Sequence, residues 1–327
     1  MFIAADADAG ARTEAMRAVV RDEYGGPDVL KIEEIDKPEL VDDGVLVRVR
    51  AAALNPTDYV LMRGFLRPQT GWRRPRQRVV GIDVAGVVEA VGADVADLAV
   101  GDAVFGVCSG AVAEYAVGVP RNLVQKPERL SFEQAAGMGV AGTMALQALR
   151  DHAQLRAGQR IAITGATGGV GSFAVQIAKA YGAHVTAVCR AENVELARQL
   201  GADRVFDYTR DDYLREERYD AILDNGGGRS LRALRRALAP GGVVVLNCGQ
   251  DISLIVAGHA ARLILRRRDV EQFVRKVTRA RLLELAALVQ DGSVTPVVDR
   301  TYPLAETPAA MRYLMARHPR GKVVVTP

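Results

Sequence analysis

One segment of this 327-residue chain constrains its fold more than any other. The apolar residues 161–163 are followed by the glycine-rich turn Thr164–Gly171, and residues 169–181 then carry apolar side chains at helical spacing. Glycines permit positive φ and let the backbone approach a pyrophosphate, while the helix N-terminus offers free N–H groups to its oxygens. The segment predicts a strand–turn–helix unit that binds a dinucleotide. A glycine turn with a purely structural role is the alternative.

The residues around this turn alternate between short apolar runs and helical patterns. Such alternation predicts an α/β fold with a doubly wound parallel sheet. The expected strands cover residues 160–164, 184–188, 204–206, 221–223 and 243–246, and the expected helices cover 169–181, 192–200 and 231–238.

The flanking sequence is rich in short strand patterns with frequent glycines, which favours a compact barrel-like β domain. The expected strands lie at 44–50, within 78–91, and at 103–105, 114–117 and 321–325, and Ser131 is expected to cap a helix. We therefore expect a nucleotide-binding domain at 138–291, inserted between two pieces of a β domain at 16–137 and 292–327. Residues 1–15 are expected to be a disordered extension, since they lack the basic start and apolar core of a signal peptide.

Arg190 follows the second expected strand, about 20 residues past the turn, where NAD-binding proteins commonly carry an acid for the ribose hydroxyls. A guanidinium there suits the 2′-phosphate of NADPH through charge-assisted hydrogen bonds. A surface ion pair between Arg190 and Glu192 is the alternative. The pattern favours NADPH as the cofactor.

Composition excludes several classes of protein. Three distant cysteines, at 108, 189 and 248, imply no disulfide framework and favour a cytoplasmic location. The longest apolar stretch, 135–149, is interrupted by glycines and too short to span a membrane. The net charge of +4 comes largely from arginine-rich stretches at 63–78 and 262–281, which lack the aromatic interleaving expected of a platform for single-stranded nucleic acid. They are either solvated surface or attract an anionic cofactor or substrate, and no specific nucleic acid is expected.

The turn alone also fits short-chain dehydrogenases, which place it near the N-terminus and use a Tyr-x-x-x-Lys pair. Here the turn lies half-way along the chain, and no tyrosine has a lysine four residues later. That class is excluded.

Five further motifs accompany the turn: Asn55-Pro56-Thr57-Asp58, Gly81-Ile82-Asp83-Val84-Ala85-Gly86, Gly101-Asp102-Ala103-Val104-Phe105-Gly106, Val140-Ala141-Gly142-Thr143 and Arg320-Gly321-Lys322-Val323-Val324. With them the chain resembles the medium-chain dehydrogenase/reductase superfamily from Met16 to Pro327, and is similar to its zinc-independent, quinone-oxidoreductase-like branch. The resemblance implies a GroES-like β-barrel catalytic domain, a Rossmann domain and NADPH-dependent reduction of a quinone, enone or related carbonyl substrate.

No metal is expected. Catalytic zinc needs three protein ligands from cysteine, histidine or carboxylate. Zinc-dependent relatives place a cysteine at Leu54-Asn55 and Gly-His-Glu at Gly81-Ile82-Asp83, and carry a four-cysteine lobe for which three scattered cysteines do not suffice. The histidines at 152, 184, 259 and 318 show no ligand spacing.

The resemblance also implies site residues. The expected catalytic residues are Asn55, Asp58, Tyr59 and Thr143, although Asn55 could be a turn residue, Asp58 a helix cap and Tyr59 a packing residue. The expected cofactor-binding residues are Thr143, Thr167, Gly168, Gly169, Val170, Lys179, Arg190, Asn193, Tyr208, Asn225, Gly226, Cys248, Gly249 and Lys322.

Several alternatives stay open. Lys179 could be a surface residue, Cys248 a packing thiol, and Trp72 either a cover for the substrate pocket or an anchor for its own loop. Alcohol–carbonyl interconversion and a non-catalytic NADPH-binding scaffold are the alternative functions. A homodimer is common among similar proteins.

Overall fold

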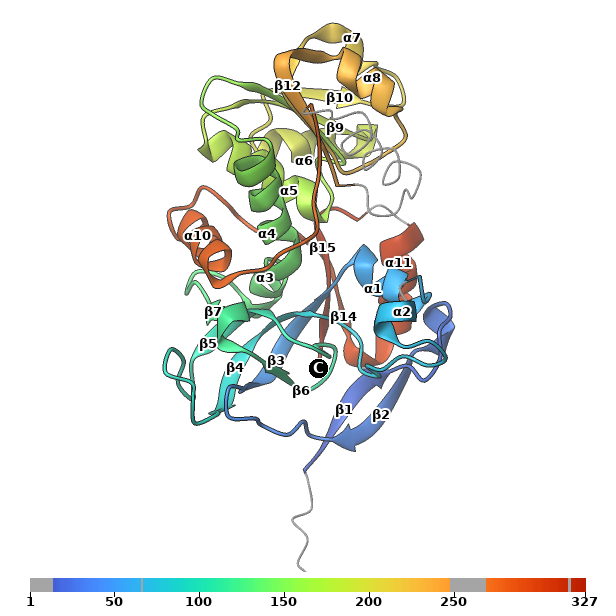
Figure 1. Cartoon of the computed structure of the whole chain (residues 1–327), viewed down its shortest axis with the longest axis vertical. Coiled ribbons are helices and arrows are strands. Elements are labelled where there is room, and N and C mark those ends of the chain that lie inside the picture. The colour runs from blue at the N-terminus through green and yellow to red at the C-terminus, as the bar shows by residue number, and fades with distance from the viewer. Residues whose placement is uncertain (1–13, 66, 248–268, 317–318) are drawn as a thin grey trace, which may run out of the picture.

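The computed structural model describes residues 14–65, 67–247, 269–316 and 319–327. The molecule is elongated, with a parallel sheet at one end and a mainly antiparallel sheet at the other, as Figure 1 shows. The expected N-terminal extension lies outside the described residues except for Glu14 and Ala15, and strand β1 begins at Ala15. In the described part of the chain, no helix is long and apolar enough to cross a membrane.

The parallel sheet has six strands in the order β10-β9-β8-β11-β12-β13. This order confirms the doubly wound sheet that the alternation predicts. Its strands are β8 (Arg160–Thr164), β9 (His184–Cys189), β10 (Arg204–Asp207), β11 (Tyr219–Asp224), β12 (Leu238–Leu246) and β13 (Val270–Gln272).

Both faces of this sheet are covered, because side chains along each strand alternate between two cores. Ile161 and Ile163 face a core shared with the helices α4, α5 and α10, whereas Ala162 between them faces the core beneath α7 and α8. The helices of this domain are α4 (Gly139–Leu146), α5 (Gly169–Ala180), α6 (Val194–Gln199), α7 (Tyr213–Glu216), α8 (Leu231–Arg236) and α10 (Arg279–Gln290), with a π-helical turn η3 (Gln147–His152) and a 3₁₀ turn η4 (Ala191–Asn193).

The second sheet has the order β14-β15-β3-β4-β5-β7, with β6 also paired to β3 and a separate β1-β2 pair. It forms the GroES-like domain that the family resemblance implies. Its strands are β1 (Ala15–Val20), β2 (Lys31–Asp36), β3 (Val45–Leu54), β4 (Asp83–Val91), β5 (Ala103–Val107), β6 (Tyr115–Gly118), β7 (Leu123–Gln125), β14 (Val298–Pro303) and β15 (Lys322–Thr326).

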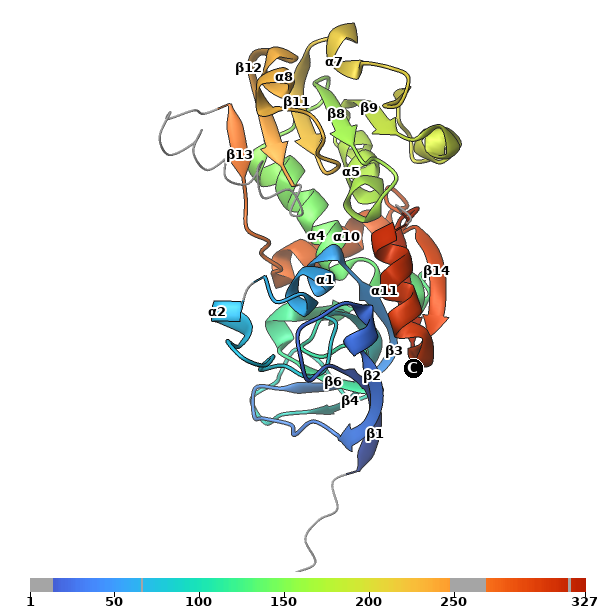
Figure 2. The same ribbon diagram turned by 90° about the vertical axis from the view of Figure 1, so that its right-hand side faces the viewer.

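Short helices cover this second sheet. Ser131 caps α3 as expected, with Ser131 Oγ accepting from Gln134 N at 3.2 Å. In Figure 2, α11 lies along β14 and close to α1. The elements are α1 (Pro56–Met62), α2 (Arg67–Thr70), α3 (Phe132–Ala136), α11 (Thr307–Ala316) and the 3₁₀ turns η1 (Pro27–Val29), η2 (Pro120–Asn122) and η5 (Leu304–Glu306).

The two domains share one continuous core. Ala51 and Phe105 of the GroES-like sheet pack in the same apolar cluster as Leu146 and Phe173 of the nucleotide-binding domain. The domain boundaries expected at 137/138 and 291/292 fall just before α4 and just after α10, and we keep them as the proposed boundaries.

Candidate functional site

The glycine turn joins the end of β8 to the start of α5 at the carboxyl edge of the parallel sheet. Gly165 has φ +58°, and a Cβ added at Gly171 would lie 2.0 Å from the Gly165 carbonyl oxygen. Only glycine at position 171 therefore lets the helix pack this closely on the turn. The strand order reverses between β8 and β11, which is where open α/β sheets bind ligands. This geometry fits a pyrophosphate on the N-terminus of α5.

Hydrogen bonds connect the end of β11 to this turn. Thr164 Oγ1 donates to Asp224 Oδ1 at 2.6 Å and accepts from Gly226 N at 2.9 Å, while Asn225 Nδ2 donates to the Thr164 carbonyl at 3.0 Å. Asn247 Nδ2 in turn donates to Asn225 Oδ1 at 2.7 Å. These bonds bring Asn225 and Gly226 beside Thr164 and Gly165, at the start of the glycine turn.

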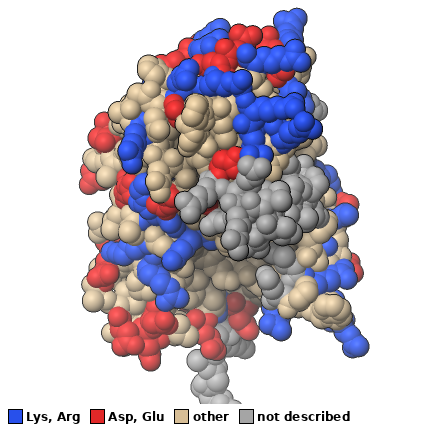
Figure 3. Space-filling model, turned by 45° about the horizontal axis from the view of Figure 1, so that its top comes forward, with Lys and Arg blue, Asp and Glu red and all other residues tan. Residues whose placement is uncertain are grey.

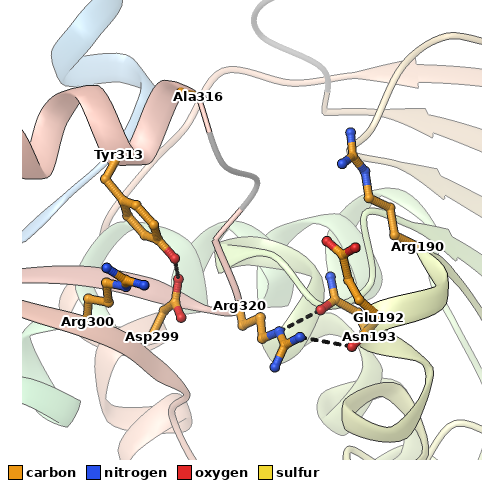
Figure 4. Close-up of a pocket in the computed structure, with 8 residues that line it drawn as sticks. All are labelled: Arg190, Glu192, Asn193, Asp299, Arg300, Tyr313, Ala316 and Arg320. Carbon is orange, nitrogen blue, oxygen red and sulfur yellow. Dashed lines mark hydrogen bonds between the residues drawn. The ribbon is translucent and has the colours of Figure 1, made fainter.

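A cavity of about 770 Å³ lies between the two domains, beyond the end of β9. Figure 4 shows Tyr313, Asp299 and Arg300 on one side and Arg190, Glu192 and Asn193 on the other, with Arg320 between them. Arg320 Nε donates to Asn193 Oδ1 at 2.7 Å, and Arg190 Nε donates to the Tyr208 hydroxyl at 2.7 Å. The cavity thus has three guanidinium groups in its lining.

Not every expected cofactor residue lies near the turn. Lys179 is ten residues into α5 from Gly169, which is about 15 Å along a helix. Its ammonium pairs with Asp203 at 2.8 Å. This pairing fits the alternative in which Lys179 is a surface residue, and we propose no cofactor contact for it. Cys248 and Gly249 lie outside the described residues.

Charge on the surrounding surface is mixed. On the face shown in Figure 3, groups of Lys and Arg side chains alternate with Asp and Glu side chains. Trp72, in the arginine-rich segment after α2, is 74% exposed. It therefore does not anchor its loop in a core.

A buried polar cluster lies where the two domains meet. Asn55 Nδ2 donates to Asp83 Oδ2 at 3.0 Å, and Lys322 Nζ donates to Asn55 Oδ1 at 2.6 Å. Lys322 Nζ also lies 3.2 Å from Asp83 Oδ2. Both polar atoms of the Asn55 amide are therefore engaged within the protein.

Asn55 and Asp58 also form a capping box at the start of α1. Asn55 N donates to Asp58 Oδ2 at 2.7 Å. Desolvation by burial raises the pKa of Asp58 to about 6, against the opposing effect of this backbone hydrogen bond. Asp58 is thus a helix cap, as one alternative held, and also a buried carboxyl group with a raised pKa.

The remaining two expected catalytic residues differ in exposure. Thr143 is buried on α4, where its hydroxyl donates to the Gly139 carbonyl at 2.6 Å. Tyr59 is half-buried on α1 and packs against the core of the GroES-like sheet.

Sequence reasoning missed two residues of this region. Asp83 appeared only within a motif, and Arg320 was given no role. The signal for Asp83 is a charged residue between apolar neighbours at the start of a strand, and Lys322 is its counterpart at the start of β15. Two isolated opposite charges on apolar strands indicate a buried pair, because an unpaired buried charge is costly.

No zinc site is visible in the described ranges. Among them, no group of three or more His, Cys, Asp or Glu side chains could hold a metal ion.

Comparison with known proteins agrees with this architecture. Residues 41–128 match the alcohol dehydrogenase GroES-like domain, and residues 200–325 match the family described as zinc-binding dehydrogenase. The NADPH-dependent alkenal/one oxidoreductase, chloroplastic, of Arabidopsis thaliana is 36% identical, over 95% of this chain and 80% of the relative.

Two solved structures are also similar. The quinone oxidoreductase from Coxiella burnetii has a TM-score of 0.84 at 30% identity, covering 96% of this chain and 100% of that chain. A mycobacterial protein complexed with NADPH has a TM-score of 0.80 at 26% identity, covering 95% of this chain and 100% of that chain. The chain therefore belongs to the medium-chain dehydrogenase/reductase superfamily, in its quinone-oxidoreductase-like branch of NAD(P)H-dependent oxidoreductases.

Proposed function

We propose that this protein is a zinc-independent, NADPH-dependent reductase of quinones, enones or related conjugated carbonyl compounds. When bound, NADPH supplies the hydride, and the protein positions the reactants. The observation that carries the proposal is the glycine turn at the carboxyl edge of the parallel sheet, which the Lys322 side chain links to the buried cluster of Asn55 and Asp58. The relatives named for alkenal and quinone reduction support the substrate class.

The choice of NADPH over NADH rests on the arginines of the cavity. Arg190 is held by Tyr208, and Arg320 is held by Asn193. A 2′-phosphate lying between them would accept charge-assisted hydrogen bonds, which are about twice as strong as neutral ones. A ribose hydroxyl offers these donors no negative charge. The similar structure that contains NADPH supports the same choice.

The remaining cofactor contacts follow from position. Thr167, Gly168, Gly169 and Val170 would hold the pyrophosphate with backbone N–H groups, and Asn225 and Gly226 would lie beneath the cofactor. Thr143 on α4 would face the nicotinamide end.

On the catalytic side, Asn55, Asp58 and Tyr59 would form the wall near the reacting carbons. Since both polar atoms of the Asn55 side-chain amide already form hydrogen bonds within the protein, we propose that Asn55 holds the other residues of this wall in place. Solvent would supply the proton to the reduced substrate. A cytoplasmic location stays a prediction.

The test mixes the purified protein with NADPH and a panel of quinones and enones while NADPH oxidation is followed. Oxidation with at least one of them, and much less with NADH, is the expected result. Tight NADPH binding without oxidation by any member would instead indicate a non-catalytic scaffold. Reduction of NADP⁺ by alcohols, without quinone or enone turnover, would indicate alcohol–carbonyl interconversion.

A further inference from the structure

Two charged residues of the buried cluster have no part in the hydride chemistry proposed above. Lys322 is 3% exposed and Asp83 is 0% exposed. We propose that Lys322 and Asp83 are a positioning pair. The pair fixes the Asn55–Met62 segment of the GroES-like domain relative to helix α4 and to the glycine turn Thr164–Gly171, called the phosphate turn below. This inference rests on the proposed function.

Lys322 touches both sides of the site. Just before it, Gly321 N donates to the Thr167 carbonyl at 2.8 Å, and Gly321 pairs with Gly168 as an isolated bridge. The aliphatic stem then passes the turn, where a Cβ added at Gly169 would lie 3.3 Å from Lys322 Cδ. The ammonium ends on Asn55 Oδ1 at 2.6 Å. One residue therefore connects the phosphate turn to the start of α1.

Asp83 extends the connection to helix α4. Its Oδ2 accepts from Asn55 Nδ2, and its Oδ1 accepts from Val140 N at 2.7 Å. A Cβ added at Gly139 would lie 2.6 Å from Asp83 Oδ1, so glycine is required for this approach. Thr143 sits one helical turn further along α4. The carboxylate thus holds the catalytic segment with one oxygen and the helix of Thr143 with the other.

A buried ion pair is weak evidence for stability, because removing both charges from water costs about as much as their attraction returns. Well-packed apolar residues would fill the same space without fixing the plane of an amide. Fully satisfied buried polar networks do fix such geometry. We therefore assign the pair to orientation of the site.

Positioning makes a kinetic prediction. Misplacement by about 1 Å can cost about 100-fold in rate even when the altered residue does not touch the reacting atoms. Loss of the Lys322 ammonium should therefore lower kcat and leave NADPH affinity nearly unchanged, because the ammonium points into the protein. If Lys322 contacted the cofactor directly, its loss would instead lower NADPH affinity and leave kcat nearly unchanged.

The test compares Lys322→Met, Asp83→Asn and the double variant with the unmutated protein. Lys126→Met is the matched control, because the Lys126 ammonium donates to the carbonyls of Pro127 and Leu130 and lies over the Phe132 ring. Hydrogen exchange in residues 55–62 is measured with and without NADPH, together with melting temperature, NADPH affinity and kcat. The isotope effect with NADPH deuterated at the transferred position is measured as well.

We expect NADPH to slow exchange in residues 55–62 of the unmutated protein and of Lys126→Met, but not of Lys322→Met. In Lys322→Met, kcat should fall about 10- to 100-fold with a larger isotope effect, and NADPH affinity should stay within about threefold. Lys322→Arg should restore part of kcat. The double variant should lose less than the product of the two single losses, because its two charges disappear together.

Three results would overturn the inference. If NADPH slowed hydrogen exchange in residues 55–62 of Lys322→Met as much as in the unmutated protein, the pair would not connect this segment to the cofactor site. A lower melting temperature with unchanged kcat would make the pair merely structural. A loss of NADPH affinity at unchanged kcat would make Lys322 a cofactor contact. Failure of the proposed function is distinct, because the unmutated protein would then bind NADPH without oxidising it, while the exchange experiment still decides on the pair.

Discussion

Gly171 is the residue at which a single added carbon tests the phosphate turn most directly. In Gly171→Ala the new Cβ would lie 2.0 Å from the Gly165 carbonyl oxygen and 2.8 Å from two backbone atoms of Ala166. Real Cβ contacts essentially never fall below 3.0 Å. All of these neighbours are backbone, so no side-chain rotation relieves the clash. Helix α5 must therefore move away from the turn by about 1 Å.

Forcing an extra methyl group into a packed site costs about 1–3 kcal/mol. If all of it fell on cofactor binding, NADPH affinity would drop by a factor of about 5 to 150, since each tenfold change corresponds to about 1.4 kcal/mol. Part of the cost will instead lower the melting temperature. Movement of the helix N-terminus away from the pyrophosphate places most of the effect on binding.

Fluorescence titration with NADPH and thermal melting, run on the same preparations, measure the two parts. Gly26→Ala is the matched control, because Gly26 has φ −81° and a Cβ there meets nothing within 4 Å. We expect Gly26→Ala to behave as the unmutated protein does. If Gly171→Ala bound NADPH with unchanged affinity and melted at an unchanged temperature, the role given to the turn would be refuted.

Three further predictions follow from the site. Arg190→Gln should lower kcat/KM with NADPH about 10- to 100-fold, since a hydrogen bond to a charged group contributes about 1.5–3 kcal/mol. The kcat/KM with NADH should stay nearly unchanged, and an equal loss with both cofactors would contradict the role given to Arg190. Burial raises the folded-state pKa of Asp58 to about 6, so the folded protein binds this proton more tightly than the unfolded chain does. The folded protein therefore loses stability as the pH rises from about 4 through about 6. The melting temperature of Asp58→Asn relative to the unmutated protein should therefore rise between about pH 4 and pH 7.5, and a constant difference would count against the raised pKa. Dialysis against a chelator should leave kcat unchanged, and a loss that added zinc restores would show that a metal takes part.

Local patterns in the sequence predicted much of the nucleotide-binding domain. The strand expected at 160–164 is β8, and the helix expected at 169–181 is α5 to within one residue. These elements were predictable because apolar periodicity and the glycine turn agree with each other there. The helix α11 was not expected, since the sequence beyond residue 292 was interpreted as β-like.

The candidate site was predictable only in part, for a physical reason. The turn is local, so its residues Thr167 to Val170 could be assigned from the sequence. The Asn55–Asp83–Lys322 cluster joins residues 239 and 267 positions apart, and no periodicity reports such a contact. Lys179 shows the same limit: its place late in α5 was predictable, but its ion pair with Asp203, 24 residues further along the chain, was not.

The central claim has two parts. The bound nicotinamide cofactor reduces a conjugated carbonyl compound or a quinone, and the cavity lined by Arg190, Arg300 and Arg320 selects NADPH over NADH. Single-turnover mixing of the NADPH-loaded, metal-free protein with a quinone and with an enone tests it most directly, with an NADH-loaded sample alongside. We predict oxidation of bound NADPH by at least one of the two acceptors, with NADH at least about tenfold weaker in affinity. Persistence of bound NADPH in the presence of both acceptors, or equal binding of NADH, would contradict the account.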